Sequence, residues 1–114
     1  MNILYELNKY FGIHIILISK INNLLKENNI IEINNLTNNC SFNTWINDKK
    51  TILAFKKENV YNYYFEIKLI HDKIHEELNK YIKYKIDIDN KLNALYINLG
   101  NLIYDIKNNK KVYL

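Results

Sequence analysis

Apolar residues recur in steps of three and four positions along three stretches of the chain, which is the spacing of residues on one face of an α-helix. We therefore expect long helices from Asn2 to about Asn28, from about Val60 to Ile86 and from about residue 91 to residue 107. The inward face of the first helix comprises Leu4, Leu7, Phe11, His14, Ile18, Ile21 and Leu25. That of the second comprises Val60, Tyr64, Ile67, His71, Ile74, Leu78 and Ile82. That of the third comprises Leu92, Leu95, Tyr96, Leu99, Leu102, Ile103 and Ile106.

Asparagine-rich segments separate these helices, and asparagine both caps helix ends and tolerates left-handed backbone angles. We expect a helix break at Asn28 or Asn29, followed by a short helix from about Ile30 to Leu36. The segment from Asn47 to Asn59 is polar at both ends and predicts a loop that leads into a helical turn. The sequence from Asp87 to Asn90 predicts a helix stop followed by the N-cap of the last helix.

Cys40 opens a segment in which two aromatic residues, Phe42 and Trp45, follow at helical spacing. We expect a short helix here, with the two rings packed beside the thiol. The chain has no proline, two glycines and no β-type alternation longer than a few residues. The predicted fold is therefore all-α. It is a single domain, residues 1–114, forming a four-helix-bundle-like helical bundle of three long helices and short segments that carry the cysteine.

The formal net charge of the chain is +4, but every basic residue is a lysine and most of the lysines are scattered. Arginine is the usual residue for base and phosphate recognition, so we expect no nucleic-acid partner. A lone cysteine cannot form an intramolecular disulfide, and the apolar run from Phe11 to Ile18 is too short to cross a bilayer. We therefore expect a soluble, cytoplasmic protein with no membrane partner.

Histidine and cysteine are scarce in this sequence, and their positions indicate a metal site. His71 and His75 are four residues apart in a helical pattern, so both imidazoles lie on one helix face and can share a metal ion. The remaining candidates are the only other histidine, His14, and the only cysteine, Cys40. Three imidazoles and one thiolate complete the tetrahedron that zinc prefers. Taken singly, His14 is more typical of a core histidine, and Cys40 of a small buried hydrophobic residue.

Taken together, these residues form three motifs in a set order. They are HII at residues 14–16, CSFNTW at residues 40–45 and HDKIH at residues 71–75, with intervals of 23 and 25 residues between them. This pattern resembles the chemoreceptor zinc-binding domain over about residues 10–80. Two positions depart from that family, because Asn43 replaces a glycine and Ile16 replaces the commoner aromatic residue. If the glycine serves a left-handed backbone angle, asparagine is the next best residue for it.

The resemblance implies a helical bundle, usually a homodimer, that binds one zinc ion per chain through the three histidines and Cys40. In that family the cysteine is also the responsive element, to zinc availability and in some members to hypochlorous acid. The implied partner is a chemoreceptor, a diguanylate cyclase or another signalling protein. We expect zinc loss or oxidation at Cys40 to free the segment from Asn34 to Trp45 from the bundle. Candidate carboxylates near the zinc ligands are Asp72, Glu76 and Asp48.

Other classes of function fit parts of this pattern. The sequence HDKIH resembles the metalloprotease motif HExxH with Asp72 in place of the glutamate, but a fourth ligand from Cys40 closes the position that catalysis needs. A di-iron bundle requires more histidines and carboxylates than this chain aligns, so we expect no enzyme. The main alternative is a metal-free helical adaptor whose histidines and cysteine are incidental core residues. The last helix lies beyond the resemblance and is either the fourth bundle helix or a docking surface.

Overall fold

The computed structural model describes residues 2–84 and 90–112, and it confirms the all-α prediction, with no strand among these residues. Three of the helices have more than twenty residues, and the shorter ones follow the first of them along the chain. The elements are α1 (Ile3–Lys26), α2 (Ile30–Asn38), α3 (Ser41–Ile46), α4 (Lys49–Lys57), the 3₁₀ turn η1 (Tyr61–Tyr63), α5 (Tyr64–Tyr84) and α6 (Asn90–Val112).

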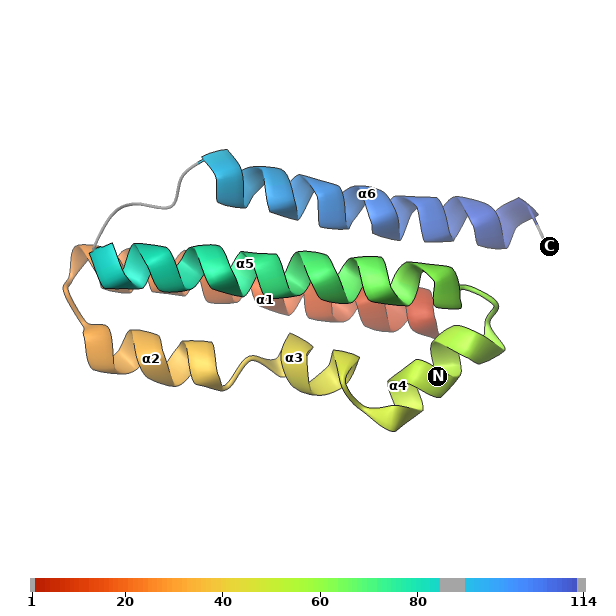
Figure 1. Ribbon diagram of the computed structural model, residues 1–114, viewed down its shortest axis with the longest axis horizontal. Helices are drawn as coiled ribbons and strands as arrows, with labels where there is room; N and C mark the ends of the chain where they lie inside the picture. Colours follow the sequence, from red (N-terminus) through yellow and green to blue (C-terminus); the bar gives the residue numbers. More distant parts are fainter. Residues whose placement is uncertain (1, 85–89, 113–114) are drawn as a thin grey trace.

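The helices form an elongated bundle, with principal extents of 49 × 26 × 18 Å. The long helix α6 runs beside both α1 and α5, and α2 and α3 follow one another in line along the opposite side of α5 from α6 (Figure 1). The short helix α4 turns across the end of the bundle near the N-terminus. The architecture is therefore four-helix-bundle-like, and its fourth member is divided into α2 and α3.

The predicted break after α1 is confirmed at two adjacent asparagines. Asn28 adopts a left-handed backbone angle, with φ of 59°, which ends α1. The side chain of Asn29 then accepts a hydrogen bond from Glu32 N at 3.3 Å and caps α2. Asparagine serves both roles because its short polar side chain bonds to nearby backbone groups and reduces the cost of a positive φ.

The segment from Asn47 to Asn59 was predicted as a loop that leads into a helical turn, and the structure extends this turn to the nine-residue helix α4. Its N-cap is Asp48, whose carboxylate accepts a hydrogen bond from Lys50 N at 2.9 Å. The inward side chains of Thr51, Ala54 and Phe55 are buried at helical spacing. A helix of nine residues is marginal on its own, so burial of this face in the bundle is what stabilises it.

The second long helix begins later than predicted. Tyr61–Tyr63 form a 3₁₀ turn, and α5 starts at Tyr64, whose hydroxyl donates a hydrogen bond to Ile46 O at 2.8 Å. This bond ties the start of α5 to the end of α3. Residues 85–89, which include the predicted helix stop, lie outside the described residues. The last helix begins at Asn90 and extends beyond the predicted end to Val112.

The predicted inward faces of the three long helices are confirmed, since every position on them is buried or half-buried. The face of α5 also holds a charged residue that the apolar pattern missed. Glu77 is only 8% exposed, and its Oε1 atom lies 3.2 Å from the ammonium groups of both Lys80 and Lys91. Lys91 is on α6, so this ion pair joins α5 to the last helix. Within the described residues, no helix is both long and apolar enough to cross a membrane.

Candidate metal centre

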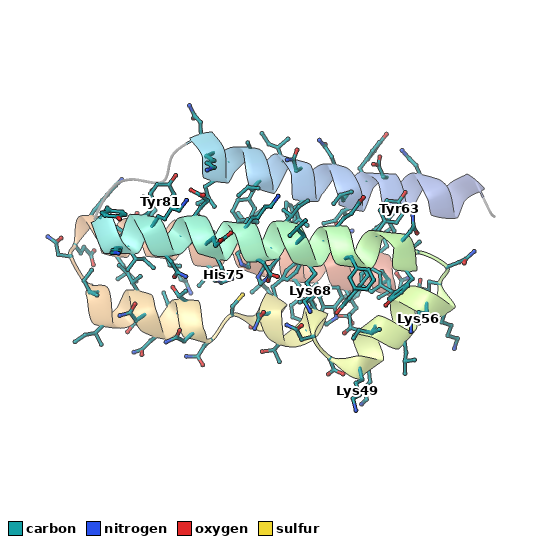
Figure 2. All side chains as sticks on the ribbon, viewed as in Figure 1. Lys49, Lys56, Tyr63, Lys68, His75 and Tyr81 are labelled. Carbon is teal, nitrogen blue, oxygen red and sulfur yellow. The ribbon has the colours of Figure 1, made fainter. Side chains whose placement is uncertain are left out.

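The four candidate metal ligands come together in the middle of the bundle. His14 lies on α1, and Cys40 is the N-cap residue of α3. His71 and His75 lie on successive turns of α5, and Figure 2 shows His75 near the middle of that helix. One ligand atom from each of the four lies within 4.8 Å of all the others. We call these four residues the donor cluster, and they form a group that could hold a metal ion.

Three of the separations within the donor cluster match those around one tetrahedral zinc ion. His75 Nε2 lies 3.2 Å from His14 Nε2 and 3.1 Å from His71 Nε2. Cys40 Sγ lies 3.5 Å from His71 Nε2. Zinc bonds of about 2.05 Å to nitrogen and about 2.3 Å to sulfur place two nitrogens about 3.3 Å apart, and a nitrogen and a sulfur about 3.6 Å apart. The residues therefore fit the metal that their donor chemistry implies.

The break between α2 and α3 places the thiol. The helix α2 ends at Asn38, with Asn39 as its C-cap residue, and Cys40 has an extended backbone, with φ of −70° and ψ of 112°, before α3 begins. Burial raises the pKa of the Cys40 thiol, while hydrogen bonds from the backbone N–H groups of Asn43 and Phe42 partly oppose this. These N–H groups belong to the first turn of α3, where they also stabilise negative charge on the sulfur.

Asn43 occupies the position at which the resembled family has glycine, and its backbone is helical because it lies inside α3. Among the described non-glycine residues, a positive φ occurs only at Asn28 and Asn59. A left-handed angle is therefore not the reason that asparagine is accommodated here. Asn43 is accommodated because a helical backbone position does not require glycine.

The two predicted aromatic residues pack beside the donor cluster. The ring of Phe42 stacks on that of His71, with centroids 4.5 Å apart and an interplanar angle of 18°, and its edge meets His14. Trp45 packs edge-on against Phe42 and stacks on Tyr10 of α1 at 4.9 Å. Phe42 and Trp45 are 1% and 6% exposed, so they exclude water from one side of the cluster.

Burial keeps the histidines of the donor cluster in their neutral, metal-binding form. The pKa of His14 is lowered to about 3 by burial and by the nearby His75. Burial, together with its histidine neighbours, also lowers the pKa of His71 to about 3. Burial lowers the pKa of His75 as well, although the carboxylate of Asp72 acts in the opposite direction. The imidazoles are ready to bind a metal at neutral pH, whereas Cys40 has to lose its proton.

Two of the three candidate carboxylates are near the donor cluster. Asp72 and Glu76 line a cavity of about 270 Å³ together with Cys40 and His75. The rest of its lining is polar and consists of Thr37, Asn38, Asn43 and Asn79. The third candidate, Asp48, instead caps α4. The cavity gives a cation a polar route to the sulfur and to the outermost histidine.

Tyr96 of α6 is a further residue at the site, although the sequence placed it only on the inward face of the last helix. Its hydroxyl oxygen is in hydrogen-bonding contact with His14 Nδ1, and the two ring centroids are 5.7 Å apart. Burial, with a contribution from Cys40, raises the pKa of Tyr96, so the phenol stays protonated at neutral pH. The signal was present in the sequence as one hydroxyl on the otherwise apolar face of the last helix, where it needs a polar partner.

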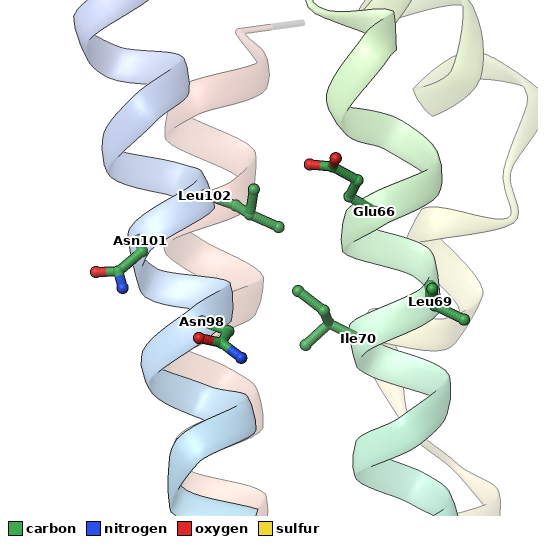
Figure 3. A pocket seen from close by; sticks show the side chains of 6 residues that line it. All are labelled: Glu66, Leu69, Ile70, Asn98, Asn101 and Leu102. Carbon is green, nitrogen blue, oxygen red and sulfur yellow. The ribbon is translucent and has the colours of Figure 1, made fainter.

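A second hollow, of about 380 Å³, lies between α5 and α6 and is shown in Figure 3. Three aliphatic side chains and three polar ones line it, namely Leu69, Ile70, Leu102, Glu66, Asn98 and Asn101. None of these residues belongs to the donor cluster, and a single carboxylate is not a metal site. Within the described residues, the donor cluster is therefore the candidate metal site.

Comparison of the chain with protein-family models, with curated proteins and with solved structures found no match. The chemistry of the site therefore follows from its own donor atoms, their burial and their separations.

Lowering the pH is expected to destabilise the metal-free protein. The folded-state pKa values of His14 and His71 are about 3, below the ordinary value of 6.5, so the unfolded chain binds protons first as pH falls. Stability is thus complete above about pH 6.5 and declines below it, by up to about 1.4 kcal/mol per pH unit for each histidine. Urea denaturation with excess chelator across this pH window measures the slope.

The variant His71→Phe is the control for this pH dependence, because it keeps a buried ring and removes one titrating group. The unfolding free energy of this variant should depend less steeply on pH than that of the wild type, by up to about 1.4 kcal/mol per pH unit, which corresponds to one proton. An unfolding free energy that is the same above and below pH 6.5 would contradict the assignment of these histidines as buried and neutral.

Proposed function

We propose that this chain is a zinc-binding regulatory module of the chemoreceptor zinc-binding type, holding one zinc ion per chain in the donor cluster. The observation that carries the proposal is the convergence of three imidazole nitrogens and one sulfur, all within 4.8 Å of one another. Three of their separations are 3.1 to 3.5 Å. These atoms come from α1, α5 and the α2–α3 break. The residues that carry them are the histidines and the cysteine of the three motifs at residues 14–16, 40–45 and 71–75. An incidental set of core histidines has no reason to direct four donor atoms at one point.

Zinc is the metal favoured by this donor set. One sulfur and three imidazole nitrogens in a tetrahedron suit a borderline-soft ion without geometric preferences of its own. Four protein ligands also close the coordination shell, whereas a catalytic zinc site keeps one position open for water or substrate. The proposed role is therefore regulatory and not enzymatic.

Cys40 is the ligand best placed to convert a chemical signal into movement. It sits in the break between α2 and α3, whereas the three histidines lie on long helices. Hypochlorous acid oxidises a thiolate by two electrons, giving a sulfenic acid and chloride, and the oxidised sulfur is a poor zinc ligand. We propose that loss of this ligand loosens the segment from Asn34 to Trp45 while α1, α5 and α6 stay packed. The surface exposed in this way would act on a second copy of the chain, a chemoreceptor or a cyclase.

Metal analysis of protein purified without an affinity tag tests the proposal. We expect about one zinc per chain in the wild type and much weaker retention in Cys40→Ala, because the variant loses the only anionic ligand. Ser41→Ala, which changes the exposed neighbouring residue, is the matched control and should retain zinc like the wild type. A well-folded wild-type protein that cannot take up added zinc would leave the metal-free adaptor as the better interpretation.

The same zinc measurement after exposure to hypochlorous acid tests the regulatory part. Wild-type protein should release zinc in proportion to oxidation of Cys40. If Cys40→Ser binds zinc as tightly as the wild type and releases it with the same oxidant dependence, the cysteine is not the responsive element.

A further inference from the structure

The last helix reaches the donor cluster through the hydroxyl of Tyr96. This hydroxyl contacts His14 Nδ1, the ring nitrogen on the opposite side from the other donors. The remaining inward positions of α6 are aliphatic and pack against the core. The ring of Tyr96 is also held by Phe11 on α1, with centroids 6.3 Å apart. Tyr96 is thus a polar link between α6 and a candidate metal ligand.

The tautomer of the His14 imidazole decides which of the two residues donates this hydrogen bond. A neutral histidine carries one proton, and the nitrogen that binds a metal must be the unprotonated one. When His14 Nε2 binds the metal, its proton is on Nδ1 and is donated to the oxygen of Tyr96. In the other tautomer, Tyr96 donates to Nδ1, and the proton on Nε2 blocks metal binding. The same two atoms therefore stay in contact, but the proton between them changes sides.

The surroundings of His71 show why the contact to His14 matters. His71 Nδ1 is buried, and the described residues place no hydrogen-bond partner near it. The ring of His71 is instead held by stacking on Phe42. Metal-binding histidines usually have a hydrogen-bond acceptor at the second nitrogen, which orients the ring and makes it a better ligand. At His14, Tyr96 supplies that acceptor.

We propose that Tyr96 is a positioning residue for the metal centre, and that it couples the docking of α6 to metal occupancy. This inference rests on the proposed zinc-binding function. Tyr96 touches no metal itself; it accepts the Nδ1 proton of His14 and so favours the ring orientation and tautomer that bind zinc. Coupling of this kind is reciprocal, so a docked α6 raises zinc affinity and bound zinc holds α6 on the bundle.

The variant Tyr96→Phe tests the inference, because it keeps the buried ring and removes the hydroxyl alone. We expect its zinc dissociation constant, measured by competition with a chromophoric chelator, to rise about 10- to 100-fold, as for other partners of metal-binding histidines. Tyr104→Phe is the matched control, since Tyr104 lies on the same helix and is 61% exposed. It should bind zinc like the wild type.

Two further measurements distinguish positioning from a purely structural role. Amide hydrogen exchange along α6 should slow on addition of zinc in the wild type and in Tyr104→Phe, and slow much less in Tyr96→Phe. In zinc-loaded protein, the NMR signal of the His14 Nδ1 proton should lose its hydrogen-bonded shift only in Tyr96→Phe. Both effects depend on the hydroxyl and not on packing.

Equal zinc affinity in Tyr96→Phe and Tyr104→Phe would overturn the inference. So would a Tyr96→Phe variant that is less stable without metal but keeps wild-type zinc affinity, because that result assigns the hydroxyl to the core alone. Failure of the proposed function is a different result, namely a wild-type protein that takes up no zinc.

Discussion

With zinc bound as proposed, its removal by a chelator is expected to lower the melting temperature of the protein by about 15 °C or more. A ligand present at about 1,000 times its dissociation constant stabilises the folded state by about 4 kcal/mol. In a domain of about 100 residues, each kcal/mol shifts the melting temperature by about 4 °C. The effect should be large here because the donor cluster joins α1, α5 and the α2–α3 break. The four ligands are close together only in the folded chain, so zinc binds the folded state in preference to the unfolded one.

Calorimetry with buffered free zinc, compared with excess chelator, measures this difference. Cys40→Ala is the control, because a site without its sulfur should show only a small dependence on zinc. The prediction fails if wild-type protein melts at the same temperature with zinc and with chelator.

Replacing Phe42 with alanine is expected to lower the free energy of unfolding by about 3 to 5 kcal/mol, the usual cost of removing a buried aromatic ring. Phe42 is 1% exposed and contacts Trp45, His14 and His71. The cavity left by its ring also removes the surface against which His71 is stacked. Zinc affinity should therefore fall together with stability.

Urea denaturation in excess chelator isolates the packing contribution, since no metal is then bound to either protein. Phe65→Ala is the matched control, because Phe65 is 60% exposed and its removal should change stability by less than about 0.5 kcal/mol. A loss of less than about 1 kcal/mol in Phe42→Ala would show that its ring is not packed as the structure has it.

The long helices were predictable because their signal is local and repeated. Each of α1, α5 and α6 shows a full series of apolar positions, so a few exceptions such as Glu77 do not obscure the pattern. The helix α4 was predicted only as a helical turn, because its apolar residues, Ile52 to Phe55, form one short run between lysines. It is stable because Phe55 packs between Trp45 and Tyr64, which come from other parts of the fold.

The donor cluster was predictable in a different way. The helical spacing of His71 and His75 predicts by itself that both lie on one face, since residues four apart on a helix are neighbours. His14 and Cys40 could only be named as candidates, from their scarcity and from the resemblance to a zinc-binding family. The distances that bring all four together, and the cavity beside Cys40, come from the structure.

Local sequence patterns establish the properties that depend on near neighbours: the all-α class, the break at Asn28 and Asn29, and the paired histidines of α5. The tertiary structure decided which distant residues meet, including Tyr96 and His14, which are 82 positions apart. Helix periodicity shows which face of a helix turns inward, but not which partner that face will find. The partner depends on how the helices pack against one another, and that depends on the shape and burial of the whole core.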